Sequence, residues 1–146
     1  MSLPTLHSPL PTPHFMRHNL ALTTASLLSI LLFGSHWAYE VAHGWETGGL
    51  AGLGGVVIMV VWLYGALVLA DRRSGQVIML VGAILSFGVL VLHMMGRGMV
   101  SPRIAASSSV FFWVWSLIAL GVSGLFSVIL SAHRLWSVVR ARRAAQ

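Results

Sequence analysis

Four long apolar runs, each almost free of charged residues, dominate this chain of 146 residues. Crossing about 30 Å of hydrocarbon takes about 20 apolar residues in helical form, because a helix satisfies its own backbone hydrogen bonds. Only 8% of the residues are charged and 57% are hydrophobic, unlike the composition of a soluble domain. The sequence therefore predicts an all-α polytopic membrane protein with four transmembrane helices, over residues 20–41, 50–70, 76–95 and 110–132.

The connections between these runs are short. Residues 71–75 join the second run to the third and leave room only for an antiparallel hairpin, so we expect an up-down bundle. Four of the five prolines lie in the first 14 residues, where they oppose a regular helix. The predicted organisation is a Pro-rich cytoplasmic arm (1–19), a transmembrane domain (20–132) and an Arg-rich cytoplasmic tail (133–146) that can continue the fourth helix.

Arginine lies mainly on one side of the predicted bundle, and the chain has no lysine. Seven arginines flank the ends that the up-down path brings together, and only Arg97 and Arg103 lie on the other side. The positive-inside rule then predicts cytoplasmic termini. The Arg, Gly and Ala bias is typical of a GC-rich bacterial genome, so we expect a bacterial inner membrane. The net charge of +6 suits anionic lipid headgroups at the cytoplasmic face rather than nucleic acid.

Ionisable residues within the spans gather toward the predicted outer side. His36, Glu40 and His43 are spaced i, i+4, i+7 and share one helical face, and His93 shares a face with Arg97 four residues on. Charged groups inside a membrane are costly, so such residues are candidates for function.

The two histidines on alternate spans are predicted to lie level with each other. His36 is 16 residues past Leu20, and His93 is 17 residues past Gln76. At a rise of about 1.5 Å per residue, each lies about 24 Å from the inner boundary. The sequence thus predicts a polar pocket near the outer mouth of the bundle.

Four interpretations of this pocket are open. In the first, Glu40 and Arg97 form an interhelical ion pair and nothing is bound. In the second, His36 or His43 joins His93 as an axial ligand of b-type haem, with Arg97 or Arg103 on a propionate.

The third interpretation is a transition-metal site, in which His36, His43 and His93 bind Cu(II) or Zn, and Met94, Met95 and Met99 offer thioethers to Cu(I). The fourth is a small proton- or metal-coupled transporter with Glu40 as its proton site. Carriers place such groups near mid-bilayer, whereas Glu40 lies near the rim.

Two further patterns concern packing. Gly44, Gly48 and Gly52 repeat every fourth residue and predict close helix packing, and a stripe of small polar residues at Ser123, Ser127 and Ser131 suits interhelical hydrogen bonds. Trp113 is predicted to belong to the aromatic belt at the outer boundary.

The sequence shows no catalytic motif and no cysteine. We therefore expect a non-enzymatic integral membrane protein that acts by association, with itself or as an accessory subunit of a larger membrane assembly. A single-haem electron-transfer subunit and a small transporter are the alternatives.

Overall fold

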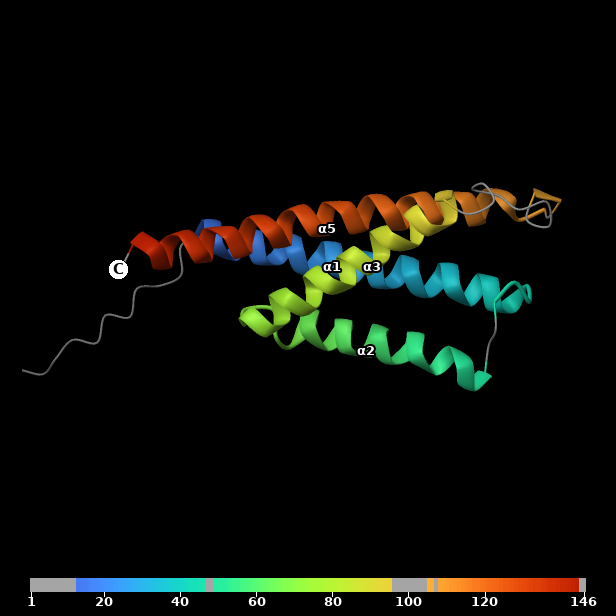
Figure 1. The fold of residues 1–146 in the computed structure, drawn as a ribbon, viewed down its shortest axis with the longest axis horizontal. Helices are drawn as coiled ribbons and strands as arrows, with labels where there is room; N and C mark the ends of the chain where they lie inside the picture. The colour runs from blue at the N-terminus through green and yellow to red at the C-terminus, as the bar shows by residue number, and fades with distance from the viewer. Residues whose placement is uncertain (1–12, 47–48, 96–104, 107, 145–146) are drawn as a thin grey trace, which may run out of the picture.

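The described part of the computed structural model comprises residues 13–46, 49–95, 105–106 and 108–144. Within these ranges the chain is helical and contains no strand. Successive helices alternate in direction, so that α1 begins and α5 finishes at the same end of the molecule (Figure 1). The predicted all-α up-down bundle is confirmed, with elements α1 (Pro13–Ala42), η1 (Gly49–Gly52), α2 (Leu53–Leu67), α3 (Arg73–Met95) and α5 (Val110–Ala144).

Three of the helices are long and apolar enough to cross a membrane: they contain the spans Leu20–Ala42, Arg73–Met95 and Val110–Ser137. The second helix is shorter than predicted, because α2 has 15 residues and is preceded by a 3-10 turn. At 1.5 Å per residue, α2 is only about 22 Å long. The prediction of one continuous helix over 50–70 is therefore wrong, and the glycines at the start of that run explain why, since glycine is a poor helix former.

The first and last helices of the chain, α1 and α5, extend beyond their predicted limits. Because proline is well tolerated in the first turn of a helix, α1 begins at Pro13, and the predicted arm is helical over residues 13–19. The rest of that arm, residues 1–12, lies outside the described residues. At the other terminus, α5 continues to Ala144, as expected for a tail that prolongs the fourth helix.

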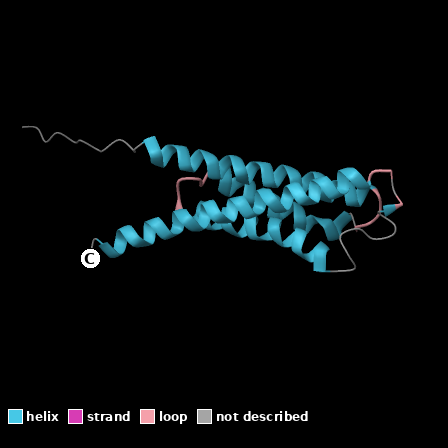
Figure 2. Cartoon of the chain, turned by 90° about the horizontal axis from the view of Figure 1, so that it is seen from above, coloured by secondary structure: helices cyan, strands magenta, loops and turns pink. Residues whose placement is uncertain are grey.

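The four helices do not pack evenly. In Figure 1, α3 crosses the bundle obliquely, from the neighbourhood of α2 to that of α5, and Figure 2 shows the same bundle from above. The most extensive contacts are those of α3 and of α1 with α5, while α2 packs against α3 and α1. A smaller contact joins α1 directly to α3. The molecule is therefore a core of α1, α3 and α5 with α2 on one side.

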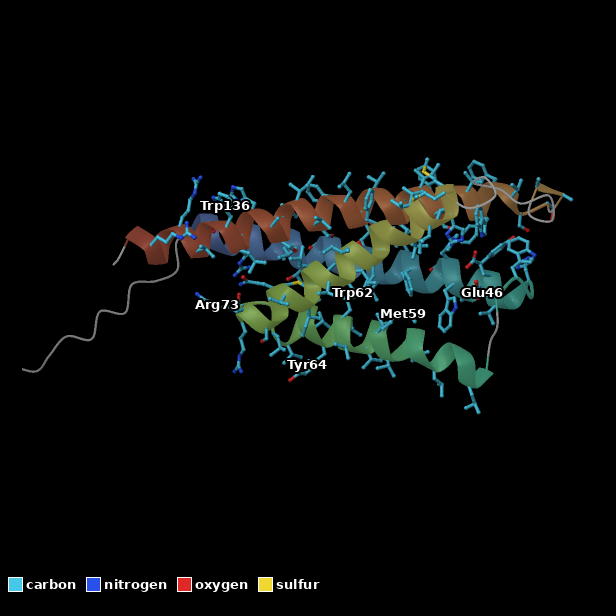
Figure 3. The ribbon with its side chains drawn as sticks, in the orientation of Figure 1. Glu46, Met59, Trp62, Tyr64, Arg73 and Trp136 are labelled. Atoms are coloured by element: carbon cyan, nitrogen blue, oxygen red, sulfur yellow. The ribbon has the colours of Figure 1, made fainter. Side chains whose placement is uncertain are left out.

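Buried apolar side chains form two clusters along this arrangement. One joins Leu22, Trp62, Ala66 and Met79, and the other is built around Trp113 and Leu117. In Figure 3, Trp62 points toward α3 whereas Tyr64 points away from the bundle. Large apolar residues are exposed on every helix, as expected of side chains that face lipid.

Glycines permit the closest approaches of the helices, although not those that the sequence pattern singled out. A Cβ on Gly82 would collide with the indole of Trp62, and one on Gly124 would lie 2.8 Å from the Phe87 backbone nitrogen. Gly44 (φ +66°) and Gly49 (φ +71°) instead turn the chain and have nothing within 4 Å of an added Cβ. The predicted packing role of Gly44 is wrong, and Gly48 lies outside the described residues.

Candidate functional site

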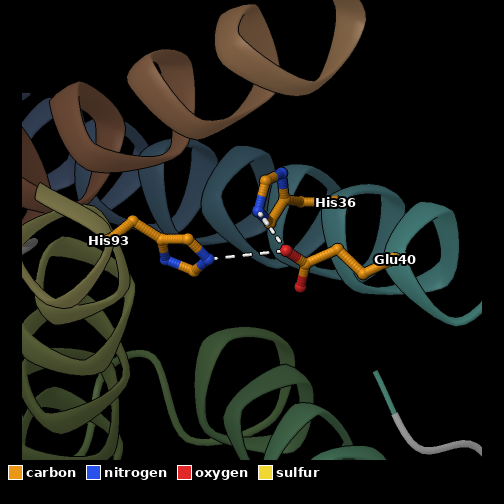
Figure 4. Close-up of side chains that lie close together, drawn as sticks. All are labelled: His36, Glu40 and His93. Atoms are coloured by element: carbon orange, nitrogen blue, oxygen red, sulfur yellow. Dashed lines mark ion pairs between the residues drawn. The ribbon is translucent and has the colours of Figure 1, made fainter. Parts of the chain in front are cut away.

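Three of the predicted site residues meet at one end of the bundle, which we call the site end. His36 and Glu40 come from the last turns of α1, and His93 comes from the last turn of α3 (Figure 4). Each offers one ligand atom, and these atoms lie within 4.8 Å of one another. His36 and Glu40 are buried, and His93 is half-buried. The predicted common level of the two histidines is thus confirmed.

Both imidazoles approach the same carboxylate oxygen. His36 Nε2 lies 3.6 Å and His93 Nε2 lies 3.4 Å from Glu40 Oε1, as the two dashed lines in Figure 4 show. The rings are nearly perpendicular, with centroids 5.7 Å apart and an interplanar angle of 82°. Spacing of i, i+4 brings His36 to Glu40 within α1, and the direct contact of α1 with α3 brings His93 to both.

The first turns of α5 complete the surroundings of the cluster. The Trp113 indole Nε1–H donates to Glu40 Oε1 at 3.0 Å, and the Ser116 hydroxyl lies 2.9 Å from His36 Nδ1. Trp113 is 1% exposed, so its predicted place in the aromatic belt is wrong. Ser116 was not predicted at all. The spacing of three residues puts Trp113 and Ser116 on one helical face, but only packing shows that this face meets α1.

The hydrogen bond made by His93 Nδ1 determines what its other nitrogen can do. Nδ1 lies 2.8 Å from the Val89 carbonyl oxygen. Because a carbonyl oxygen only accepts, Nδ1 carries the proton. In a neutral ring, the Nε2 of His93 then presents a lone pair toward Glu40.

His36 reaches the same state through Ser116. The Ser116 hydroxyl donates to the Trp113 carbonyl oxygen at 3.0 Å, so it is the acceptor for His36 Nδ1–H. The neutral ring again leaves a lone pair on Nε2. This nitrogen is buried and has no hydrogen-bond partner among the described residues.

When both rings are neutral, two imidazole nitrogens and a carboxylate oxygen therefore converge with no proton between them. Protonating His93 would give an ion pair with Glu40 but would leave His36 Nε2 unpartnered. A metal ion would satisfy all three atoms. Tetrahedral ligands about 2.1 Å from Zn²⁺ lie about 3.4 Å from one another, close to the two measured separations. Backbone or hydroxyl acceptors on the outer nitrogens of ligating histidines are also typical of metal sites.

The other predicted site residues do not join this cluster in the described structure. His43 is exposed, its Nδ1 lies 2.9 Å from the Tyr39 carbonyl oxygen, and its ring stacks on Tyr39. Arg97 lies outside the described residues, so its pairing with Glu40 stays a prediction. Met94 and Met95 are exposed, which places their thioethers away from the buried ligands.

The geometry does not fit a haem between the two histidines. Glu40 Oε1 lies 3.6 Å from His36 Nε2 and 3.4 Å from His93 Nε2, and the Trp113 ring is 5.3 Å from each imidazole, centroid to centroid. Two axial ligands would need an open slot for the macrocycle between them. The arrangement suits a single ion. No protein-family model, curated protein or solved structure matches the chain.

Proposed function

We propose that this chain is a non-enzymatic integral membrane protein that binds one transition-metal ion through His36, Glu40 and His93. One observation carries the proposal: both Nδ1 atoms are engaged as donors, and both Nε2 atoms converge on Glu40 Oε1 at 3.4–3.6 Å. The three long apolar helices support the membrane assignment.

The donor set determines the class of metal. Two imidazoles and one carboxylate, without a thiolate, suit Zn²⁺, Co²⁺ and Cu²⁺ better than Cu⁺ or Ca²⁺. Three protein ligands leave a fourth position open, and half-buried His93 gives access to it. An open, accessible position argues against a purely structural role for the ion.

The positions of the arginines support an orientation of the protein in the membrane. Exposed Arg72 and Arg73 lie at the end opposite the site, and in Figure 3 Arg73 and Trp136 lie far from Glu46. The Arg140 guanidinium lies 5.2 Å from the centre of the Trp136 ring. We therefore place this end at the anionic cytoplasmic face of a bacterial inner membrane, and the metal site outside. Association with a second copy or a larger assembly would use the exposed apolar surface.

Cobalt binding tests the metal site directly. Protein purified in detergent with a tag that contains no histidine is stripped with a chelator and titrated with Co²⁺. We expect one Co²⁺ per chain, with visible absorption bands that Zn²⁺ displaces, and no Soret band from haem.

Two single substitutions localise the binding. His93→Ala removes a ligand and should abolish the cobalt bands, whereas His43→Ala removes an exposed histidine of the same chain and should leave them unchanged. Binding that survives in His93→Ala, or that is lost equally in His43→Ala, would refute the site.

A further inference from the structure

Polar side chains continue from the site through the whole length of the core. Five polar residues of α5 are buried: Ser116, Ser123, Ser127, Ser131 and Arg134. They follow one another at intervals of seven, four, four and three residues, which keeps them on one helical face. The α5 face that begins beside the site therefore ends near the opposite end of the bundle.

The two helices that pack on this face contribute polar groups of their own. Ser26 and Ser29 of α1, and Gln76 and Ser86 of α3, are all buried. We call these residues and the inward-facing residues of α5 the polar core. Within the described residues, α2 buries only Trp62, Gly65 and Ala66, and the one polar side-chain atom among them is the Trp62 indole nitrogen.

Some members of the polar core hydrogen-bond to one another or to the backbone. The Ser29 hydroxyl donates to Ser123 Oγ at 3.0 Å, and the hydroxyls of Ser86 and Ser123 donate to the Leu120 carbonyl oxygen at 3.1 and 3.0 Å. Farther from the site, the side-chain oxygen of Gln76 accepts hydrogen bonds from Arg134 Nε and Nη2 at 3.1 Å each, when the amide is oriented with its oxygen toward the guanidinium.

Other members are fully buried without any partner in the described residues. These are the hydroxyls of Ser26, Ser127 and Ser131, and with them Nε2 of His36. Burying a hydroxyl without a hydrogen bond is unfavourable, and lipid chains offer none. Serines that only join helices would bond across the interface, as Ser29 and Ser123 do, so this role leaves the three hydroxyls unexplained. Buried water typically bonds to polar groups that have no partner within the protein.

We propose that the polar core holds a file of water molecules that conducts protons between the site end and the opposite end. Each hydroxyl both donates and accepts, so it can hold a neighbouring water in a continuous chain. In each step a hydronium ion passes one proton to the next water, becomes water, and leaves a new hydronium ion one position farther along.

This inference rests on the serines and does not require the proposed metal site. The assays below are therefore run with a chelator present, so that failure of metal binding and failure of proton conduction can be told apart.

Proton flux in liposomes is the first test. A potassium gradient with valinomycin drives protons into vesicles that hold the purified protein and a trapped pH-sensitive dye. We expect a flux well above that of protein-free vesicles, and at least a fivefold decrease in the double variant Ser127→Ala, Ser131→Ala. Ser137→Ala is the matched control, because Ser137 is an exposed serine of the same helix.

A wild-type flux no greater than that of empty vesicles would overturn the proposal. So would an unchanged flux in the double variant, or an equal loss in Ser137→Ala.

The absence of cysteine from the chain allows a second test that does not depend on flux. Single variants Ser127→Cys and Ser131→Cys are treated in membranes with Ag⁺, and thiols that remain free are labelled with a maleimide after unfolding. Ile129→Cys is the control, because Ile129 lies between them on α5 and is exposed toward lipid.

We expect Ag⁺ to protect the two core thiols at least ten times faster than the control thiol. Core thiols that react no faster than the control would show a dry core and refute the water file. Each cysteine variant is first shown to elute from a sizing column as the wild type does, so that slow protection is not caused by misfolding.

Discussion

The helix α2 and the core of α1, α3 and α5 have similar apolar sequences but bury different chemistry. On its inner side α2 buries an indole, a glycine and an alanine. The other three helices bury His36, Glu40, Gln76, Arg134 and a series of serines. The length of α2, 15 residues, also sets it apart from the three helices that can span a membrane.

The proposed functions therefore involve three helices, and α2 is expected to act as a packing element. The Trp62 indole of α2 lies against Gly82 of α3, so the contact depends on shape rather than on polar groups. Changes at the face of α2 should therefore alter stability without altering metal binding, and changes at the site should do the reverse. The predictions below test that separation.

The largest effect is expected from Glu40→Gln, which removes the carboxylate shared by both histidines. The amide oxygen can still accept from Trp113, so the fold should persist. Metal affinity should fall by at least about 100-fold, which corresponds to about 2.7 kcal/mol. Competition between the protein and a zinc-sensitive dye measures the change. An affinity within threefold of the wild type would show that the carboxylate is not a ligand.

The second prediction concerns the other side of the comparison. In Gly82→Val, the added Cβ alone collides with the Trp62 indole and two methyl groups add further bulk, and overpacking of this kind costs about 1–3 kcal/mol. Thermal unfolding in detergent should show the loss, while the zinc affinity of the folded protein stays within threefold. A parallel loss of affinity would mean that α2 does hold the site in shape.

A smaller effect is expected where α5 supports the site without touching the metal. Ser116→Ala removes the acceptor that orients the His36 ring. Loss of such a supporting hydrogen bond typically lowers metal affinity by about 10–100-fold. Ser137→Ala, on the exposed side of α5, is the control and should have no effect. Equal affinities in both variants would mean that Ser116 does not orient the ligand.

The pH dependence of metal affinity should also distinguish changes at the site from changes at α2. Imidazole binds a metal only when its ligating nitrogen is unprotonated, so affinity should fall as the pH is lowered. In Gly82→Val the dependence should match the wild type. Titrations with Co²⁺ at several pH values measure both slopes, and an affinity that does not fall as the pH is lowered would argue against imidazole ligands.

The smallest effect is expected at the outer face of α2. Val57 is 60% exposed, and Val57→Ala removes only surface that faces lipid. Exposed substitutions of this kind usually change stability by less than about 0.5 kcal/mol. The unfolding temperature and zinc affinity should both match the wild type, and a clear loss of stability would indicate that a partner or a second copy covers this face.

Particular residues show how far sequence reasoning reaches. The level of His36 and His93 follows from counting residues along two apolar runs, and the structure bears it out. The position of Glu40 one turn after His36 follows from helical spacing. Trp113 resembles a belt residue by depth alone, yet it lies inside and donates to Glu40.

The sequence by itself determined the all-α class, the alternating direction of the helices and the common level of His36 and His93, because apolar run length and rise per residue are local quantities. Only the tertiary structure decided that Trp113 and Ser116 face the histidines, that His43 turns away and that α2 stands outside the polar core. Those outcomes depend on the rotation of each helix about its own axis, which is set by contacts between helices far apart in the chain.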